Sequence, residues 1–203
     1  HGDNEGLVLP PAIAPIQVVI VPVAAHKPGV LEKAAEIAET LKKAGLRVKL
    51  DDSDQSPGWK YAQYEMKGVP LRLEIGPRDI ENGNCVLVRR DNREKTVVAL
   101  DNLVESTQQM LKDFAKAIYE KAKANLEGNI TPAHNIQEMK DILQKRVGFV
   151  KAMWCGDQAC EDEIKDRFGA SSRCMPFDQT PIGETCVCCG KPAKKVIYFA
   201  KAY

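Results

Sequence analysis

Cysteines supply the clearest chemical pattern in this sequence, and six of the seven lie after residue 150. Cys155 and Cys160 are spaced C-x4-C, while Cys186 and Cys189 are spaced C-x2-C and precede Gly190. Each short turn can present two thiolates from one side, and two pairs complete a tetrahedron around Zn²⁺ at about 2.3 Å. Four cysteine ligands would make the site structural, because a catalytic zinc keeps a position open for water. The spacing predicts structural zinc, with free thiols in a reduced core as the alternative.

The other cysteines leave one choice open. Cys188 could replace Cys189 as the fourth ligand, and we favour Cys189 because C-x2-C-G is the recurrent zinc-knuckle turn. Cys174 stands alone and is expected to pack, whereas Cys85 opens an apolar strand and should behave as a small hydrophobic residue. A clustered, odd-numbered set without a secretory signal favours metal over disulfides, and it favours a reducing, cytoplasmic setting.

A second pattern joins Tyr61 and Glu65, four residues apart on an expected helix, to Arg72 on the strand that follows. An aromatic ring can stack on an unpaired base, a carboxylate can accept from the N1 and N2 protons of guanine, and a guanidinium can donate to O6 and N7. Sequence-specific RNA recognition usually targets unpaired loop bases in this way. On pattern alone, a Glu–Arg surface ion pair beside a Tyr at the core edge is the commoner meaning.

Weaker signals come from a basic turn and from the histidines. Arg89, Arg90, Arg93 and Lys95 surround an expected hairpin tip that could contact phosphates, although a solvated turn is the more usual reading. The three histidines have no neighbouring Ser, Cys or Asp pattern that would build a nucleophilic triad. No P-loop and no G-x-G-x-x-G motif occurs. This stretch of sequence therefore shows no self-contained catalytic apparatus.

Composition narrows the possible functions further. The formal net charge of +1 argues against nucleic-acid binding through overall positive charge, so any such site must be local. No run of about 18 apolar residues is present, which argues against a membrane span. The first residues lack the basic region and cleavage site of a signal peptide. The missing initiator Met suggests a piece of a longer chain.

Strands and helices are expected to alternate around these residues. Two consecutive β-α-β units predict parallel strand pairs in an α/β fold, and the polar turn DNRE predicts a hairpin between two later strands. The expected strands are 16–23, 47–52, 69–76, 84–90, 96–100 and 194–203, and the expected helices are 27–45, 56–68, 105–126 and 135–154.

The domain organisation is predicted from the local composition and from the positions of glycine and proline. Residues 1–15 are rich in Gly and Pro and are interpreted as an extended piece and connector. Gly128 and Pro132 interrupt the chain after a long helix, which favours a domain boundary in this region. We expect one domain at 16–115 and a second at 116–203, whose loop-rich middle depends on the metal.

Several long motifs, in order along the chain, resemble prolyl-tRNA synthetases of the archaeal and eukaryote-like type. They are HGDNEGLVLPPAIAPIQVVIVPV, WKYAQYEMKGVPLRLEIGPRDIENGNCVLVRRDN, MWCGDQACEDEIK, SSRCMPF, CVCCGKPA and FAKAY. The resemblance implies a class IIa anticodon-binding fold, a five-stranded mixed sheet flanked by helices, followed by a small α+β zinc-binding domain. It also implies that residues 1–15 end a class II catalytic domain that lies mostly upstream.

The resemblance assigns roles to particular residues. An aromatic, a Glu and an Arg of the family read the two guanines of the proline anticodon, and they correspond to Tyr61, Glu65 and Arg72. The aromatic is often Phe, so Tyr61 is a mild departure. The zinc ligands of the family correspond to Cys155, Cys160, Cys186 and Cys189, with Cys188 departing from the commonest pattern. The terminal carboxylate of the family reaches toward the active site and corresponds to that of Tyr203.

The resemblance also implies a reaction and its partners. The whole enzyme would join proline to tRNA(Pro) with ATP and Mg²⁺. As in the family, it would be a homodimer in the cytoplasm, and it would bind neither membrane nor DNA. The ATP-binding motifs would lie upstream, so we expect this chain alone to show no ATP–pyrophosphate exchange. Arg89, Arg90 and Lys95 would then be contacts to the tRNA backbone. The alternative is a structural zinc domain that braces the catalytic domain or a partner, with negligible tRNA binding by the isolated chain.

Overall fold

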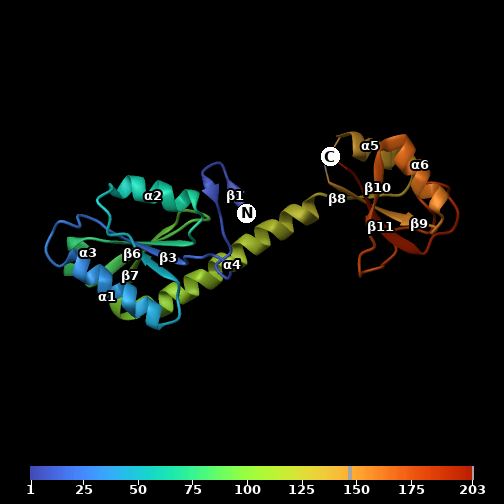
Figure 1. Cartoon of the computed structure of the whole chain (residues 1–203). Helices are drawn as coiled ribbons and strands as arrows, with labels where there is room; N and C mark the ends of the chain where they lie inside the picture. Colours follow the sequence, from blue (N-terminus) through green and yellow to red (C-terminus); the bar gives the residue numbers. More distant parts are fainter. Residues whose placement is uncertain (146–147, 203) are drawn as a thin grey trace. The chain divides into compact units, whose positions relative to one another are not determined.

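The computed structural model describes residues 1–145 and 148–202, which form two compact units. The first unit comprises His1–Lys121 and the second Ala122–Tyr203. A long helix, α4 (Leu103–Gly128), contributes to both units (Figure 1).

A five-stranded mixed sheet forms the centre of the first unit, with strand order β4-β3-β5-β6-β7. Strand β3 pairs in parallel with β4 and β5, and β5-β6 and β6-β7 are antiparallel. This arrangement confirms the predicted mixed sheet flanked by helices. The strands are β3 (Val18–Pro22), β4 (Val48–Leu50), β5 (Leu71–Ile75), β6 (Asn84–Arg89) and β7 (Lys95–Ala99). The helices are α1 (Val30–Lys43), α2 (Pro57–Met66) and α3 (Pro77–Glu81), and a short 3₁₀ turn, Leu100–Asn102, leads into α4.

The two faces of this sheet pack against different helices. Alternate residues of a strand point to opposite faces, so Val18 and Ile20 join the main core with α1 and the first turns of α4. Val19 and Val21 belong instead to a smaller core beneath α2. The same alternation on β5 sends Leu71, Leu73 and Ile75 into the main core. Arg72 and Glu74 are consequently placed on the α2 face of the sheet.

Helix α2 begins at a conventional cap and buries one of its faces. The Ser56 hydroxyl accepts a hydrogen bond from the Trp59 backbone N–H at 3.4 Å. Tyr64 and Lys60 are the buried residues, while Trp59 lies half exposed. The Lys60 ammonium is satisfied in the interior, since it donates to the carbonyl oxygens of Asp51 and Ser53 at 2.9 and 2.7 Å.

Residues 1–9 form a small hairpin rather than a plain connector. Strands β1 (Gly2–Asp3) and β2 (Gly6–Leu7) pair in antiparallel fashion. The hairpin contacts the end of α2, because the Leu9 N–H donates to the Gly68 carbonyl at 3.3 Å.

The second unit contains a four-stranded sheet of order β10-β11-β9-β8. Its core includes Met139, Ile164 and Phe199. The strands are β8 (Ile130–Ala133), β9 (Phe149–Trp154), β10 (Ala170–Cys174) and β11 (Lys195–Lys201). The helices are α5 (Ile136–Lys145) and α6 (Gln158–Phe168).

The expected helix over 135–154 is wrong in its second half. Helix α5 ends at Lys145, and Phe149–Trp154 forms a central strand between β11 and β8. Gly148 has φ +132, a conformation that L side chains rarely adopt, and a Cβ there would lie 3.1 Å from that of Asn129. Val150 and Ala152 are both buried, so the apolar spacing reflects a strand with one face in the core.

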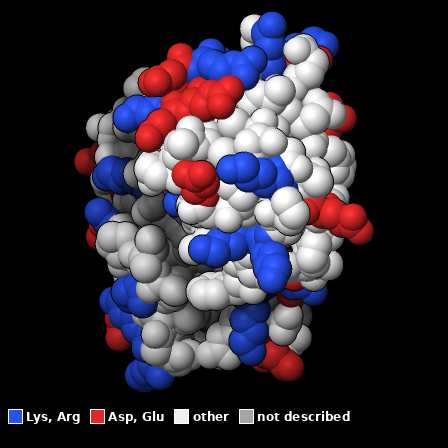
Figure 2. Space-filling model, turned by 90° about the vertical axis from the view of Figure 1, so that its right-hand side faces the viewer, with Lys and Arg blue, Asp and Glu red and all other residues white. Residues whose placement is uncertain are grey.

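Charge and hydropathy at this level are unremarkable. None of the helices among the described residues is both long enough and apolar enough to span a bilayer. Figure 2 shows basic and acidic side chains interspersed among uncharged ones, so neither sign covers the face that it displays. Together with the net charge of +1, this favours a nucleic-acid site formed by a local arrangement of side chains.

Candidate nucleic-acid interface and metal centre

Tyr61, Glu65 and Arg72 lie together on the α2 face of the first sheet. The Arg72 guanidinium carbon is 3.8 Å from the centroid of the Tyr61 ring, which is the geometry of a cation–π stack. Arg72 Nη1 donates to Glu65 Oε1 at 2.8 Å. The sequence pattern thus corresponds to a real cluster on α2 and β5, and its role in recognition stays a prediction.

Glu74 is a member of this cluster that sequence reasoning missed. Its Oε1 accepts from Arg72 Nε at 2.9 Å and lies 2.9 Å from Arg72 Nη2. Its Oε2 lies 3.7 Å from the Lys95 ammonium on β7. The strand alternation that placed Arg72 on this face also placed Glu74 there, and that signal could have identified it. Glu74 therefore fixes the plane of the guanidinium against Tyr61.

The environment of Tyr61 keeps its phenol neutral. Burial, the negative charge of Glu74 and a hydrogen bond to that carboxylate together raise the pKa of Tyr61 to about 12, against the opposing charge of Arg72. The neutral ring packs against the small core beneath α2 and against the guanidinium of Arg72. The cluster therefore combines an aromatic ring with a carboxylate and a cation.

The sheet beyond this cluster is open to solvent. Val97 on β7 is 66% exposed, and it pairs with Val86, which in turn pairs with Glu74. The exposure of Val97 was not expected from the sequence, because it depends on where α2 stops covering the sheet.

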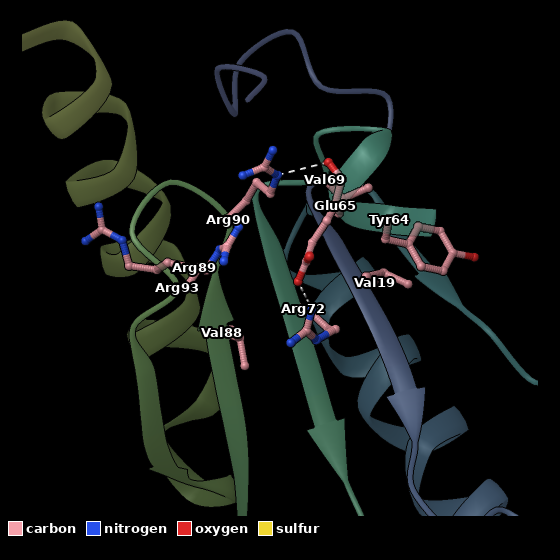
Figure 3. Close-up of a pocket in the computed structure, with 9 residues that line it drawn as sticks. All are labelled: Val19, Tyr64, Glu65, Val69, Arg72, Val88, Arg89, Arg90 and Arg93. Carbon is pink, nitrogen blue, oxygen red and sulfur yellow. Dashed lines mark hydrogen bonds and ion pairs between the residues drawn. The ribbon is translucent and has the colours of Figure 1, made fainter. Parts of the chain in front are cut away.

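The arginines of the expected hairpin tip are engaged by carboxylates. Arg90 is buried and pairs with Asp3, and Arg89 makes a two-point contact with Asp91 at 2.9 and 2.7 Å. Both arginines line a small cavity of about 10 Å³. Figure 3 labels them among the residues that surround it. Lys95 is the exposed member of the proposed backbone contacts, with a side chain 60% accessible. Phosphate contact by Arg89 or Arg90 would require these ion pairs to open.

Four thiols gather in the second unit. The sulfurs of Cys155, Cys160, Cys186 and Cys189 all lie within 4.8 Å of one another. The separations Cys155–Cys160 and Cys155–Cys189 are 3.7 and 3.8 Å. A tetrahedron with metal–sulfur bonds of about 2.3 Å has edges of about 3.8 Å, so the sulfurs fit a bound metal ion. The four cysteines could therefore hold a metal ion.

The backbone around Cys186 favours its thiolate. Burial raises the pKa of Cys186, but the backbone N–H groups of Cys189, Cys188 and Cys155 outweigh it and lower that pKa to about 7. The turn is closed by the Gly190 N–H, which donates to the Cys186 carbonyl at 3.0 Å. Cys188 lies outside this set of sulfurs, and its thiol donates to Glu163 at 3.3 Å.

The remaining candidates lie elsewhere. Cys85 is fully buried in the core of the first sheet. Cys174 is exposed at the end of β10, whereas packing was expected. Tyr203 lies outside the described residues.

Two family models match separate parts of the chain. Residues 17–110 match the anticodon binding domain, and residues 136–203 match the prolyl-tRNA synthetase C-terminal domain. The chain belongs to the prolyl-tRNA synthetase family.

Curated relatives carry the same family along the whole chain. Proline–tRNA ligases of Clostridium botulinum (strain ATCC 19397 / Type A), Lachnoclostridium phytofermentans and Lachnospira eligens are 58%, 57% and 53% identical over all 203 residues. In each case the chain spans 42% of the length of the relative. The cluster on α2 and β5 therefore lies in the anticodon-binding domain of a prolyl-tRNA synthetase, and the four cysteines lie in its C-terminal domain.

Proposed function

We propose that the first unit reads the anticodon of tRNA(Pro), with Tyr61, Glu65 and Arg72 contacting its guanines. The observation that carries this proposal is the stack of Arg72 on Tyr61, with Glu65 bonded to the same guanidinium, whose side chain is 10% exposed on the α2 face of the sheet. A solvated ion pair would not need an aromatic surface and an exposed aliphatic neighbour beside it.

The chemistry of the three side chains matches guanine. The contacts of Arg72 with Glu65 and Glu74 engage its three nitrogens and leave N–H groups on both Nη atoms, which can donate to O6 and N7. The Glu65 carboxylate can accept from the N1 and N2 protons, and adenine offers no such pair. Lys95 supplies a positive charge near the phosphates, with Arg89 and Arg90 contributing if their ion pairs open.

The second unit has a structural part in this proposal. Cys155, Cys160, Cys186 and Cys189 would hold Zn²⁺, which contributes folding free energy when it is bound. Cys155 and Cys160 flank the start of α6, and the other pair lies in the turn before β11. The metal would therefore join two segments that are distant in sequence.

The whole enzyme would use this recognition to charge tRNA(Pro) with proline from ATP and Mg²⁺ in the cytoplasm, as a homodimer. Residues 16–115 would recognise the anticodon, residues 116–203 would form the zinc-binding domain, and residues 1–15 would continue from the catalytic domain. Binding energy gained at the anticodon would orient the distant acceptor end of the tRNA for reaction. The carboxylate of Tyr203 would approach the active site of the catalytic domain.

Binding of RNA to the 203-residue chain tests this function. We expect a proline tRNA transcript to bind more tightly than a copy with both anticodon guanines replaced by adenine, and the ratio should persist at higher salt. Phosphate contacts alone would give equal binding to both RNAs and a steep loss with salt. Equal affinities at both salt concentrations would overturn the anticodon function.

A bracing function of the second unit is supported by one surface feature. Phe177 is fully exposed and Met175 is 56% exposed, on the loop that follows β10. Exposed apolar side chains that lie close together in sequence are typical of a docking surface. If bracing is the main function, Phe177→Ser should weaken binding to the separately expressed catalytic domain while leaving RNA binding unchanged. Unaltered domain binding in this variant would remove the support for bracing.

A further inference from the structure

One buried guanidinium ties the N-terminal hairpin to the helix that carries Glu65. Arg90 directly follows β6, and its side chain is 2% exposed. Its Nη1 and Nη2 donate to the two carboxylate oxygens of Asp3 at 2.8 and 2.7 Å. Its Nε donates to the backbone carbonyl of Glu65 at 2.9 Å, drawn as a dashed line in Figure 3. A two-point charged contact of this kind is both strong and directional.

Backbone packing holds the same hairpin against the end of α2. A Cβ at Gly6 would lie 2.7 Å from the Met66 carbonyl oxygen, and a Cβ at Gly68 would lie 2.6 Å from that of Leu7. Both distances are shorter than ordinary contacts, so the hairpin touches the helix end with glycine backbone on each side. Residues 1–9 and the last turn of α2 are therefore in direct contact.

The last turn of a helix needs such support, because its carbonyls lack partners within the helix. The Glu65 carbonyl accepts from the Gly68 N–H at 3.0 Å and from Arg90. With its backbone held in this way, the Glu65 side chain reaches down to Arg72 at 2.8 Å (Figure 3). Arg90 thus holds the backbone of Glu65. The Glu65 carboxylate belongs with Tyr61 and Arg72 to the cluster proposed to read guanine, which we call the recognition cluster.

We propose that Asp3 and Arg90 are positioning residues for base recognition, through which the N-terminal hairpin sets the orientation of Glu65. This inference rests on the proposed function of the first unit. In this role Arg90 acts through the backbone of Glu65 and does not itself contact a base. The coupling is reciprocal, so engagement of Glu65 by a guanine must also stabilise the hairpin on α2.

The test uses variants that disturb the hairpin from two sides. Asp3→Asn keeps the shape of residue 3 and removes its charge, while Gly6→Ala inserts a methyl group where Met66 leaves no room. Each should lower the preference for the guanine transcript over the adenine transcript by about threefold to tenfold, as expected for residues that modulate a site without touching its ligand. Asp3→Glu, which retains the charge, should recover most of the preference.

Matched controls come from the same unit. Gly58→Ala places a methyl group on α2 where nothing lies within 4 Å, and Asp54→Asn removes an exposed charge from the loop before α2. Both should keep the wild-type preference. If Arg72→Ala loses the preference while Asp3→Asn and Gly6→Ala keep it, the positioning role is overturned and the proposed function stands. If Arg72→Ala also keeps it, the proposed function itself fails.

Amide hydrogen exchange supplies a readout that a merely structural role would not move. Exchange in residues 1–9 should slow when the guanine transcript binds the wild-type chain, and it should slow less with the adenine transcript. Asp3→Asn should lose this difference between the two RNAs even where circular dichroism shows an unchanged fold. Identical exchange in residues 1–9 with both transcripts and without RNA would overturn the coupling.

Discussion

At the scale of single residues, the recognition cluster depends on Glu74 as much as on the residues that would touch RNA. The Glu74 carboxylate contacts two nitrogens of Arg72. It also helps to raise the pKa of Tyr61 and lies 3.7 Å from the Lys95 ammonium. A carboxylate that is shared in this way holds the cation and the ring in one arrangement before any base arrives. Such preorganisation lowers the entropic cost of binding.

The raised pKa of Tyr61 gives a direct test of this arrangement. Its phenol should stay protonated until the pH approaches about 12 in the folded chain, against 10.0 without these surroundings. Because the folded pKa is the higher one, its contribution to stability is complete below pH 10 and is lost as the pH rises toward 12. A titration of phenolate absorbance should show that Tyr61→Phe removes one late-ionising group. Loss of a group that ionises near pH 10 would contradict the cluster geometry.

Sequence reasoning reached some of these residues and missed others for physical reasons. The alternation of LRLEI put Arg72 on a polar face, and helical spacing put Tyr61 and Glu65 on one side of α2. The Asp3–Arg90 pair joins residues 87 positions apart, and no local pattern reports such a contact. The burial of Lys60 could not be predicted either. Lysine is rarely buried unless it is paired, and the sequence does not reveal the two carbonyl partners of Lys60.

At the scale of elements, the second unit carries two cysteine pairs that are attached to different elements. One pair precedes and enters α6, and the other lies in the turn before β11. The long segment between Phe168 and Lys195 contains only one strand, β10. Joining the two pairs through a metal ion would therefore restrict most of this segment.

Cys155→Ser tests the contribution of the metal to folding. Structural zinc contributes about 10–16 kcal/mol in small zinc-binding peptides, so loss of one ligand should unfold the second unit and leave the first intact. We expect zinc content to fall from one ion per chain toward none, with new protease cleavage after residue 150. Cys188→Ser is the matched control and should retain both zinc and protease resistance. A protease-resistant, zinc-free Cys155→Ser chain would contradict this role of the metal.

The secondary structure of the second unit was harder to predict than that of the first. The β-α-β pattern of the first unit follows from runs of β-branched residues and from well-marked helix ends. In the second unit, Met139 and Leu143 mark a helix whose apolar spacing continues by coincidence into strand β9. Gly148 has a backbone conformation that does not fit a helix, and it lies against Asn129. A local sequence pattern does not reveal a contact with a residue so far away in the chain.

At the scale of the whole molecule, the chain combines an anticodon binding domain with a unit whose four cysteines could hold a metal ion. Its net charge of +1 leaves little long-range attraction for RNA, which is consistent with the proposal that close contacts at the α2–β5 cluster provide the specificity. The family of the chain and this cluster together support anticodon recognition as the central function.

The most direct measurement compares wild type and Arg72→Ala in binding to a proline tRNA transcript and to the copy without anticodon guanines. Wild type should prefer the guanine transcript, and Arg72→Ala should lose about 1–3 kcal/mol of that preference, the usual value of a two-point base contact. Binding of both chains to the adenine transcript should be nearly equal, because phosphate contacts remain. An undiminished preference in Arg72→Ala would contradict recognition by this cluster.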